Sequence, residues 1–194
     1  MSLKPWPCCR NIHGFVEAAL ILKKEQGLQP EEIKEIVVLS GGLRRSYYED
    51  LDRRRRPKTS ADAKFSLPFV LGVALDRGDV LLEDFSAQGR ENERALLTAQ
   101  KVKSRFEEKY QREGIEIGAV EIVMKNGKKY SQEVPFAYGH PQNPIKKEDL
   151  RKKFRDCAKY SVRPLTPERV EQIIETVEDL EKVADMREFV SLLS

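Results

Sequence analysis

The segment 4–13 gathers the side chains of this chain that are best suited to chemistry. Lys4, Arg10 and His13 lie on a stretch stiffened by two prolines, which runs into a predicted helix N-terminus. Backbone N–H groups at a helix start favour negative charge, Arg10 can hold a carboxylate through two parallel hydrogen bonds, and Lys4 can add a point charge. His13 titrates near neutral pH and can take a proton beside that carboxylate. The segment is therefore a candidate carboxylate site.

Other interpretations of the histidines and cysteines stay open. Basic clusters near a chain end are commonly solvated, and single histidines are commonly structural. Cys9 lies close to His13 in sequence, but no residue is placed to orient the pair and no oxyanion-hole motif accompanies it, so we do not interpret Cys9 as a nucleophile. His140 stands in a Gly-His-Pro sequence and is expected to be a turn residue.

The run Arg53–Arg56 is the one feature that suggests nucleic acid or phosphate. Acidic residues precede it and no aromatic residues interleave it, which favours a solvated or partner-contacting loop. Gly41 and Gly42 lack the rest of any phosphate-loop pattern and are expected to end a strand. The sequence therefore gives no nucleic-acid or nucleotide site.

Periodicity and turn signals place these residues on helices and a small sheet. Asn126-Gly127, between two β-rich runs, predicts an antiparallel hairpin, and Thr166 is expected to cap an amphipathic C-terminal helix. Pro68 is expected to kink a buried helix that begins at Ser60. The fold class is α+β, with a small, mainly antiparallel sheet packed with helices and followed by C-terminal amphipathic helices. Predicted helices cover 12–26, 60–75, 91–102, 146–160 and the part after 166; predicted β segments cover 33–39, 106–112, 115–124 and 128–134; a loop covers 43–60.

The composition limits the classes of protein to which this chain can belong. The 194 residues are 40% hydrophobic and 35% charged, which suits a folded domain with a core, and the net charge of +3 gives no large field for nucleic acid or an anionic membrane. The longest apolar stretch, Phe69–Leu75, is far shorter than the roughly 20 residues of a membrane span. Three cysteines make no disulfide set or common zinc pattern. We expect a cytoplasmic protein.

Three motifs in order along the chain resemble the C-terminal portion of the MmgE/PrpD family, which includes 2-methylcitrate dehydratase and cis-aconitate decarboxylase. They are KPWPCCRNIH at 4–13, DAKFSLPF at 62–69, and GHPQNP at 139–144 followed by Leu150 and Lys153-Phe154. The resemblance covers nearly the whole chain. It implies that residues 1–160 form the C-terminal α+β domain and that residues 161–194 resemble helices which return to the family's helical domain.

The resemblance also implies the chemistry. Family members carry out eliminations, decarboxylations or epimerisations beside a carboxylate, generally without a cofactor. By position, Lys4 resembles the family's active-site lysine and His13 is the second expected catalytic residue, while Arg10, Cys9 and Phe69 are the expected substrate contacts. Phe69 stands where the family often has Tyr, so a hydroxyl is missing there.

The resemblance leads to two functional hypotheses. The first is a substrate-closing domain of a cofactor-independent lyase for small di- or tricarboxylates, inactive without an N-terminal helical domain that supplies the main base. The expected partners are that carboxylate, that helical domain and a second copy of the chain, with no nucleic acid and no membrane. The alternative is a non-catalytic binding or assembly module, which keeps the fold and uses the apolar stripe of 166–194 to pair.

Overall fold

The computed structural model describes residues 2–41, 50–110 and 117–193, and the chain divides into two compact units. The first unit is Met1–Ile145 and contains the sheet; the second is Lys146–Ser194 and contains helices only. The predicted α+β class is confirmed. Among the described residues, no helix combines the length and the apolar character needed to cross a bilayer.

The sheet of the first unit has four strands in the order β2-β1-β3-β4. β1 pairs in parallel with β2 and antiparallel with β3, and β3 pairs antiparallel with β4, so the sheet is mainly antiparallel as predicted. The Asn126-Gly127 hairpin is confirmed, and Gly127 takes the left-handed conformation (φ 84°) that its turn requires. The strands are β1 Ile33–Ser40, β2 Val102–Phe106, β3 Gly118–Met124 and β4 Lys129–Val134.

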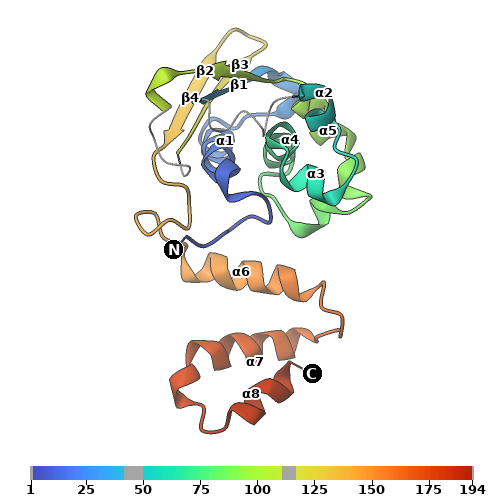
Figure 1. The fold of residues 1–194 in the computed structure, drawn as a ribbon, viewed down its shortest axis with the longest axis vertical. Coiled ribbons are helices and arrows are strands. Elements are labelled where there is room, and N and C mark those ends of the chain that lie inside the picture. Colours follow the sequence, from blue (N-terminus) through green and yellow to red (C-terminus); the bar gives the residue numbers. More distant parts are fainter. Residues whose placement is uncertain (1, 42–49, 111–116, 194) are drawn as a thin grey trace. The chain divides into compact units, whose positions relative to one another are not determined.

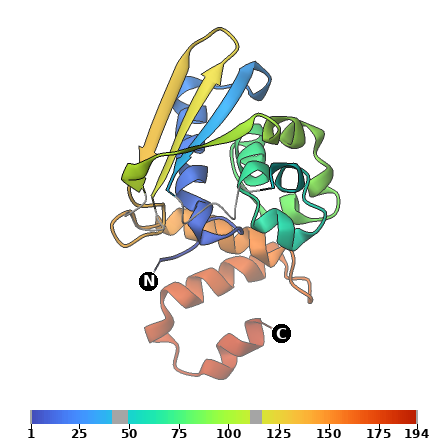
Figure 2. The same ribbon diagram turned by 45° about the horizontal axis from the view of Figure 1, so that its top comes forward.

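One face of this sheet is covered by α1 (His13–Gln26), and α4 (Leu67–Arg77) packs against α1, as Figures 1 and 2 show. Side chains alternate between the two faces of a strand, and Ile36 of β1 and Ile122 of β3 lie fully buried on the covered face. α1 approaches β3 so closely that a Cβ on Gly118 would overlap the main chain of Gly14. This contact sets how closely the N-terminal turn of α1 packs against β3.

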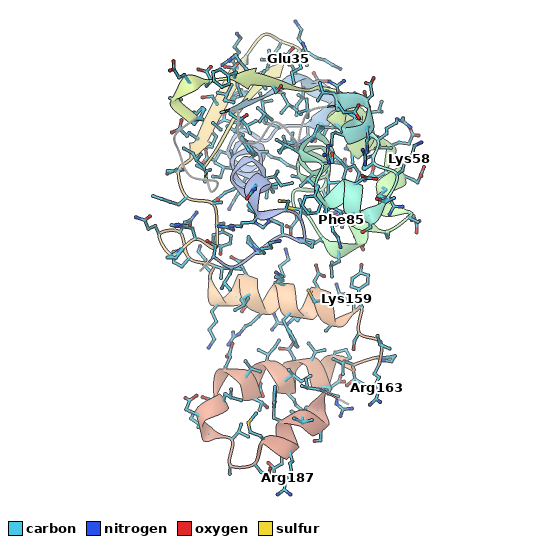
Figure 3. All side chains as sticks on the ribbon, in the orientation of Figure 1. Glu35, Lys58, Phe85, Lys159, Arg163 and Arg187 are labelled. Atoms are coloured by element: carbon cyan, nitrogen blue, oxygen red, sulfur yellow. The ribbon has the colours of Figure 1, made fainter. Side chains whose placement is uncertain are left out.

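The opposite face of the sheet carries charged side chains in pairs. Glu35 of β1 pairs with Lys103 of β2, and Arg105 of β2 pairs with Glu121 of β3 at 3.5 Å. Figure 3 shows Glu35 on the sheet, whereas Phe85 lies among the helices. The alternation of apolar and charged residues therefore orients the sheet with its apolar face toward α1.

The segment 51–77 differs from its prediction. Leu51–Arg55 forms a short helix, α2, inside the predicted loop, whose residues 42–49 lie outside the described residues. The predicted helix with a kink at Pro68 is two helices, α3 (Ser60–Lys64) and α4. The kink prediction was wrong because Pro68 occupies the first turn of α4, where its missing N–H has no partner to lose.

The arginine run is held down by hydrogen bonds instead of being a solvated loop. Arg54 donates to the carbonyl of Phe65 (3.1 Å), Arg55 donates to the carbonyl of Val102 (2.7 Å), and Arg53 pairs with Asp62 (2.7 Å). Three of its four arginines thus tie α2 to neighbouring segments. Further helices of this unit are α5 (Glu93–Ala99) and the short 3-10 turns Arg10–Ile12, Pro30–Glu32, Leu82–Phe85, Gly89–Glu91 and Glu108–Tyr110.

Two predicted elements begin at other residues than expected: the second strand and the first helix. The strand predicted at 106–112 lies earlier, as β2, because the chain turns into a 3-10 helix at Glu108; residues 111–116 lie outside the described residues. The helix predicted over 12–26 begins one residue later, at His13, and ends at Gln26 as predicted, where the left-handed conformation of Gly27 (φ 61°) closes it.

The second unit contains α6 (Lys147–Ala158), α7 (Pro167–Glu178) and α8 (Met186–Leu192), with a 3-10 turn at Leu180–Lys182. Thr166 caps α7 by accepting the N–H of Arg169, as predicted. Val170, Ile173 and Ile174 of α7 are buried. The predicted C-terminal amphipathic helices are therefore present.

Candidate active site

Lys4 lies exposed on a segment whose main chain is tethered on both sides. Before it, the N–H of Leu3 donates to the carbonyl of Gly139 at 2.9 Å. After it, the buried indole of Trp6 donates to Asp79 at 3.2 Å, and the N–H of Cys9 donates to the carbonyl of Lys64 at 2.9 Å. Lys4 is thus an exposed residue on a main chain that is held on both sides.

Arg10 makes the hydrogen bonds that hold this segment against the turn 137–143. Its guanidinium donates to the carbonyls of Leu3 (3.0 Å), Ala137 (3.1 Å) and Tyr138 (2.8 Å). These bonds give the side chain a clear positioning role. Its contact with a substrate carboxylate stays a prediction.

His13 lies fully buried at the start of α1, where the sequence placed a proton-transferring group. Nδ1 is 3.3 Å from Arg10 Nη1, Nε2 is 3.4 Å from the carbonyl oxygen of Cys8, and the ring packs edge-on against Trp6 at 5.3 Å. A guanidinium only donates and a carbonyl only accepts, so this pattern assigns the proton to Nε2. The geometry describes a histidine that orients Arg10, and its catalytic role stays a prediction.

The remaining predicted contacts lie deeper. Cys9 is half-buried beside the fully packed Cys8, and burial raises the pKa of the Cys8 thiol far above its usual value. Phe69 is fully buried in α4, with its ring edge-on to Phe85 at 6.2 Å between centroids. Phe69 is therefore a core residue of this unit, and its contact with substrate stays a prediction, as does that of Cys9.

Glu17 belongs to this region, although it was not predicted to. It follows His13 by one helical turn on α1, and its half-buried carboxylate accepts the N–H of Tyr138 at 2.5 Å and the side-chain amide of Asn143 at 2.9 Å. Burial raises the pKa of Glu17, and the two hydrogen bonds and the charge of Arg10 offset part of that rise. The i, i+4 spacing from His13 was the only sequence signal.

The turn 137–143 accepts hydrogen bonds from Arg10 and from the N–H of Leu3, and it donates two to Glu17. Gly139 has φ 90°, and a Cβ there would overlap the carbonyl of Leu3. The N–H of Gly139 donates to the carbonyl of Asn143, and that of Asn143 donates to the carbonyl of His140, both at 2.8 Å. His140 stacks on Phe136 and is part of the turn, as predicted. The structure therefore brings Arg10, Glu17 and the main chain of Leu3, which precedes Lys4, together at this turn; His13 is joined to it through Arg10.

The charge and the donors of the region suit an anion. Lys4 and Arg10 both lie close enough to Cys8 that their positive charges act on its thiol. Within the ranges 2–41, 50–110 and 117–193, no group of three or more histidine, cysteine or carboxylate side chains is placed to hold a metal ion. A fixed cation of this kind can stabilise charge that develops on a substrate carboxylate.

Comparison with known proteins decides the family. The model of the MmgE/PrpD C-terminal domain matches residues 6–181, a span that includes Arg10, His13, Glu17 and the turn 137–143. The chain belongs to the MmgE/PrpD family. This confirms the resemblance given by the three sequence motifs.

A curated relative of this MmgE/PrpD domain is the cis-aconitate decarboxylase of Mus musculus. It is 27% identical over 206 residues, which cover 100% of this chain and 39% of that protein. The MmgE/PrpD chain described here therefore spans well under half the length of that relative.

Proposed function

We propose that this MmgE/PrpD domain closes the active site of a lyase that removes a proton next to a carboxylate of a small di- or tricarboxylate. Its family includes dehydratases and decarboxylases, and its curated relative is named for decarboxylation of cis-aconitate. The observation that supports the proposal is the exposed residue Lys4 on a main chain tethered at Leu3, Trp6 and Cys9. A preorganised cation costs no reorganisation when charge develops.

In the proposed elimination, a base takes the proton from the carbon next to the carboxylate, and the electron pair of the C–H bond moves toward that carboxylate. Lys4 stabilises the negative charge that accumulates there. The pair then forms the carbon–carbon double bond as the hydroxyl group leaves and takes up a proton to become water. In a decarboxylation the carbon–carbon bond to a carboxylate breaks instead of a C–H bond: carbon dioxide leaves, and the electron pair that remains on carbon takes up a proton.

The base is assigned to the helical domain of the complete enzyme. Both ring nitrogens of His13 face partners inside this unit, and its ring has no exposed surface. A general base must come within hydrogen-bond reach of the proton that it abstracts. This domain alone is therefore expected to be inactive, with His13 acting through Arg10.

The test compares the 194-residue chain with the full-length protein of its gene. Both are assayed by ultraviolet absorbance for unsaturated products from methylcitrate and citrate, and for consumption of cis-aconitate. Turnover is expected only in the full-length protein, and Lys4→Ala should lower kcat/KM there by about 10²-fold or more. The matched control is Lys24→Ala, which removes an exposed lysine of α1. Activity in the short chain, or an active Lys4→Ala enzyme, would overturn the proposal.

One observation favours the alternative of a binding or assembly module. Between α6 and α7 lies a hollow of about 470 Å³, and the apolar side chains along it include the exposed Leu150 and Val177. Pairing of this face with a second copy of the chain would bury it. Sedimentation velocity across a wide concentration range tests this: a concentration-dependent dimer that Leu150→Glu dissociates supports pairing, and a monomer throughout rejects it.

A further inference from the structure

We infer that Glu17 is a positioning residue for the proposed site: by gripping the turn 137–143 it fixes the main chain that carries Lys4. This inference rests on the proposed function for what Lys4 is positioned to do. Its structural part stands on the described contacts alone.

Two charged side chains bind the main chain of Tyr138. Its N–H is bound by Glu17 and its carbonyl by Arg10, at 2.5 Å and 2.8 Å. Both side chains come from the N-terminal end of the same helical segment, seven residues apart in sequence. With both polar groups of its main chain bound by charged side chains, Tyr138 cannot turn without breaking a charge-assisted hydrogen bond.

Glu17 also binds the other end of the turn, through Asn143. The side-chain amide of Asn143 donates one hydrogen to Glu17 and one to the carbonyl of Phe136, each at 2.9 Å. The carbonyl of Asn143 in turn accepts the N–H of Gly139. Glu17 is thus the acceptor that joins the start and the end of the turn.

The turn is hydrogen-bonded to the main chain next to Lys4. The carbonyl of Gly139 accepts the N–H of Leu3, and Gly139 lies so close to Leu3 that a Cβ would not fit between them. Leu3 immediately precedes Lys4. A turn that loses its contacts with Glu17 therefore holds the main chain next to Lys4 less firmly, because Arg10 then joins it to the helical segment without Glu17. Glu17 itself makes no hydrogen bond to Leu3 among the contacts described for residues 2–41 and 117–193.

The experiment measures amide hydrogen exchange at Leu3 by NMR in three variants. Glu17→Ala removes both acceptor contacts. Glu25→Gln changes an exposed carboxylate on the same helix, and Ile122→Val weakens the sheet core without touching the turn. Exchange at Leu3, taken relative to a core amide such as Val120, is expected to rise about tenfold in Glu17→Ala and to stay unchanged in the two controls.

The same variants in the full-length protein link this to activity. Glu17→Ala is expected to lower kcat/KM at least about tenfold at temperatures where the protein is fully folded, while Ile122→Val lowers the melting temperature and leaves kcat/KM in place. Unchanged exchange at Leu3 in Glu17→Ala overturns the inference. So does full kcat/KM in that variant. An inactive wild-type full-length protein overturns the proposed function instead, and the exchange rates at Leu3 still decide whether Glu17 positions this segment.

Discussion

The guanidinium of Arg10 lies 3.3 Å from Nδ1 of His13, and this contact determines what each residue can do. Because the guanidinium donates, Nδ1 must accept, and the proton of the ring is then on Nε2, toward the carbonyl of Cys8. Arg10 in turn has its donors directed at main-chain carbonyls. Arg10, the expected substrate contact, thus supports the turn 137–143, and His13, the expected catalytic residue, contacts Arg10; their roles toward substrate stay predictions.

Arg10→Lys tests this support. A lysine keeps the charge but cannot reach three carbonyls with a planar fork, so at least one carbonyl loses its partner. The free energy of unfolding is expected to fall by about 1–3 kcal/mol. Urea denaturation measures it. The control Arg56→Lys alters an exposed arginine and should stay within about 0.5 kcal/mol of wild type; an equal effect of the two substitutions would refute the role of Arg10.

Gly139→Ala tests the close approach of Leu3 to the turn. Gly127 provides a matched control, since both glycines have positive φ (90° and 84°), but a Cβ on Gly127 meets open space whereas one on Gly139 meets the carbonyl of Leu3. Left-handed strain of about 1–2 kcal/mol is common to both variants. Gly139→Ala is therefore expected to lose more stability than Gly127→Ala in the same urea titration. Equal losses would show that Leu3 moves away without cost.

Phe69→Tyr tests the position at which the family often has a tyrosine. The ring of Phe69 is fully buried against Phe85, so a new hydroxyl enters the core without a designed partner. The expected loss is about 1–3 kcal/mol in the free energy of unfolding. Phe65→Tyr, at a phenylalanine that is 49% exposed, is the control and should be nearly neutral. A neutral Phe69→Tyr would mean that this core has a partner for the hydroxyl.

The sequence predicted the sheet and most helices because their signals are local. Asn126-Gly127 determined a hairpin, and the spacing of Val170, Ile173 and Ile174 determined the buried face of α7. The break between α3 and α4 was also available locally, since Ser66 accepts the N–H of Phe69 as an N-cap two residues before Pro68.

The support around Lys4 could not be predicted in this way. Glu17 meets Tyr138 across 121 positions of sequence, and no periodicity links an α1 carboxylate to a turn so distant. His13 differs, because its neighbours Trp6, Cys8 and Arg10 lie just before it in sequence; the helical pattern alone does not show that this segment folds over its ring. Residue type identified the candidates, and long-range packing decided which main-chain groups Arg10 and Glu17 contact.

The pH dependence of stability tests the environment of Glu17. Burial raises its pKa above the ordinary 4.5, so above that pH the folded protein holds a proton that the unfolded chain releases. The stability contributed by this group is fully present below about pH 4.5 and is lost as the pH rises through the folded pKa. Glu17→Gln does not titrate. The difference in unfolding free energy, wild type minus Glu17→Gln, should therefore fall as the pH rises above about 4.5, and a difference that rises would contradict the assignment.

The same urea series contains its own check, because Asp84 is also a buried carboxyl. Burial raises the pKa of Asp84, partly offset by the N–H of Leu81 and by Arg77. It titrates in both proteins and cancels in the difference. The remaining dependence on pH then belongs to Glu17.

Glu178 offers the opposite case in the second unit. Arg151 donates to both of its carboxylate oxygens at 2.6 Å and Lys147 adds a third contact at 2.8 Å, which together lower the pKa of Glu178 to about 2. For a lowered pKa, the stabilising effect is present above the ordinary value of 4.5 and is lost as the pH falls through about 2. NMR titration of the Glu178 side chain measures this directly.

Arg151→Met removes the two hydrogen bonds from the guanidinium to Glu178. The pKa of Glu178 should then return toward 4.5, because these hydrogen bonds are the main cause of its shift. Arg187→Met is the matched control, since that arginine pairs with Asp185 within the same unit and should leave Glu178 unaltered. A wild-type Glu178 that titrates near 4.5 would show that solvent screens the fork. The pairing of α6 with α7 would then rest on Ile173, Ile174 and their apolar neighbours rather than on charge.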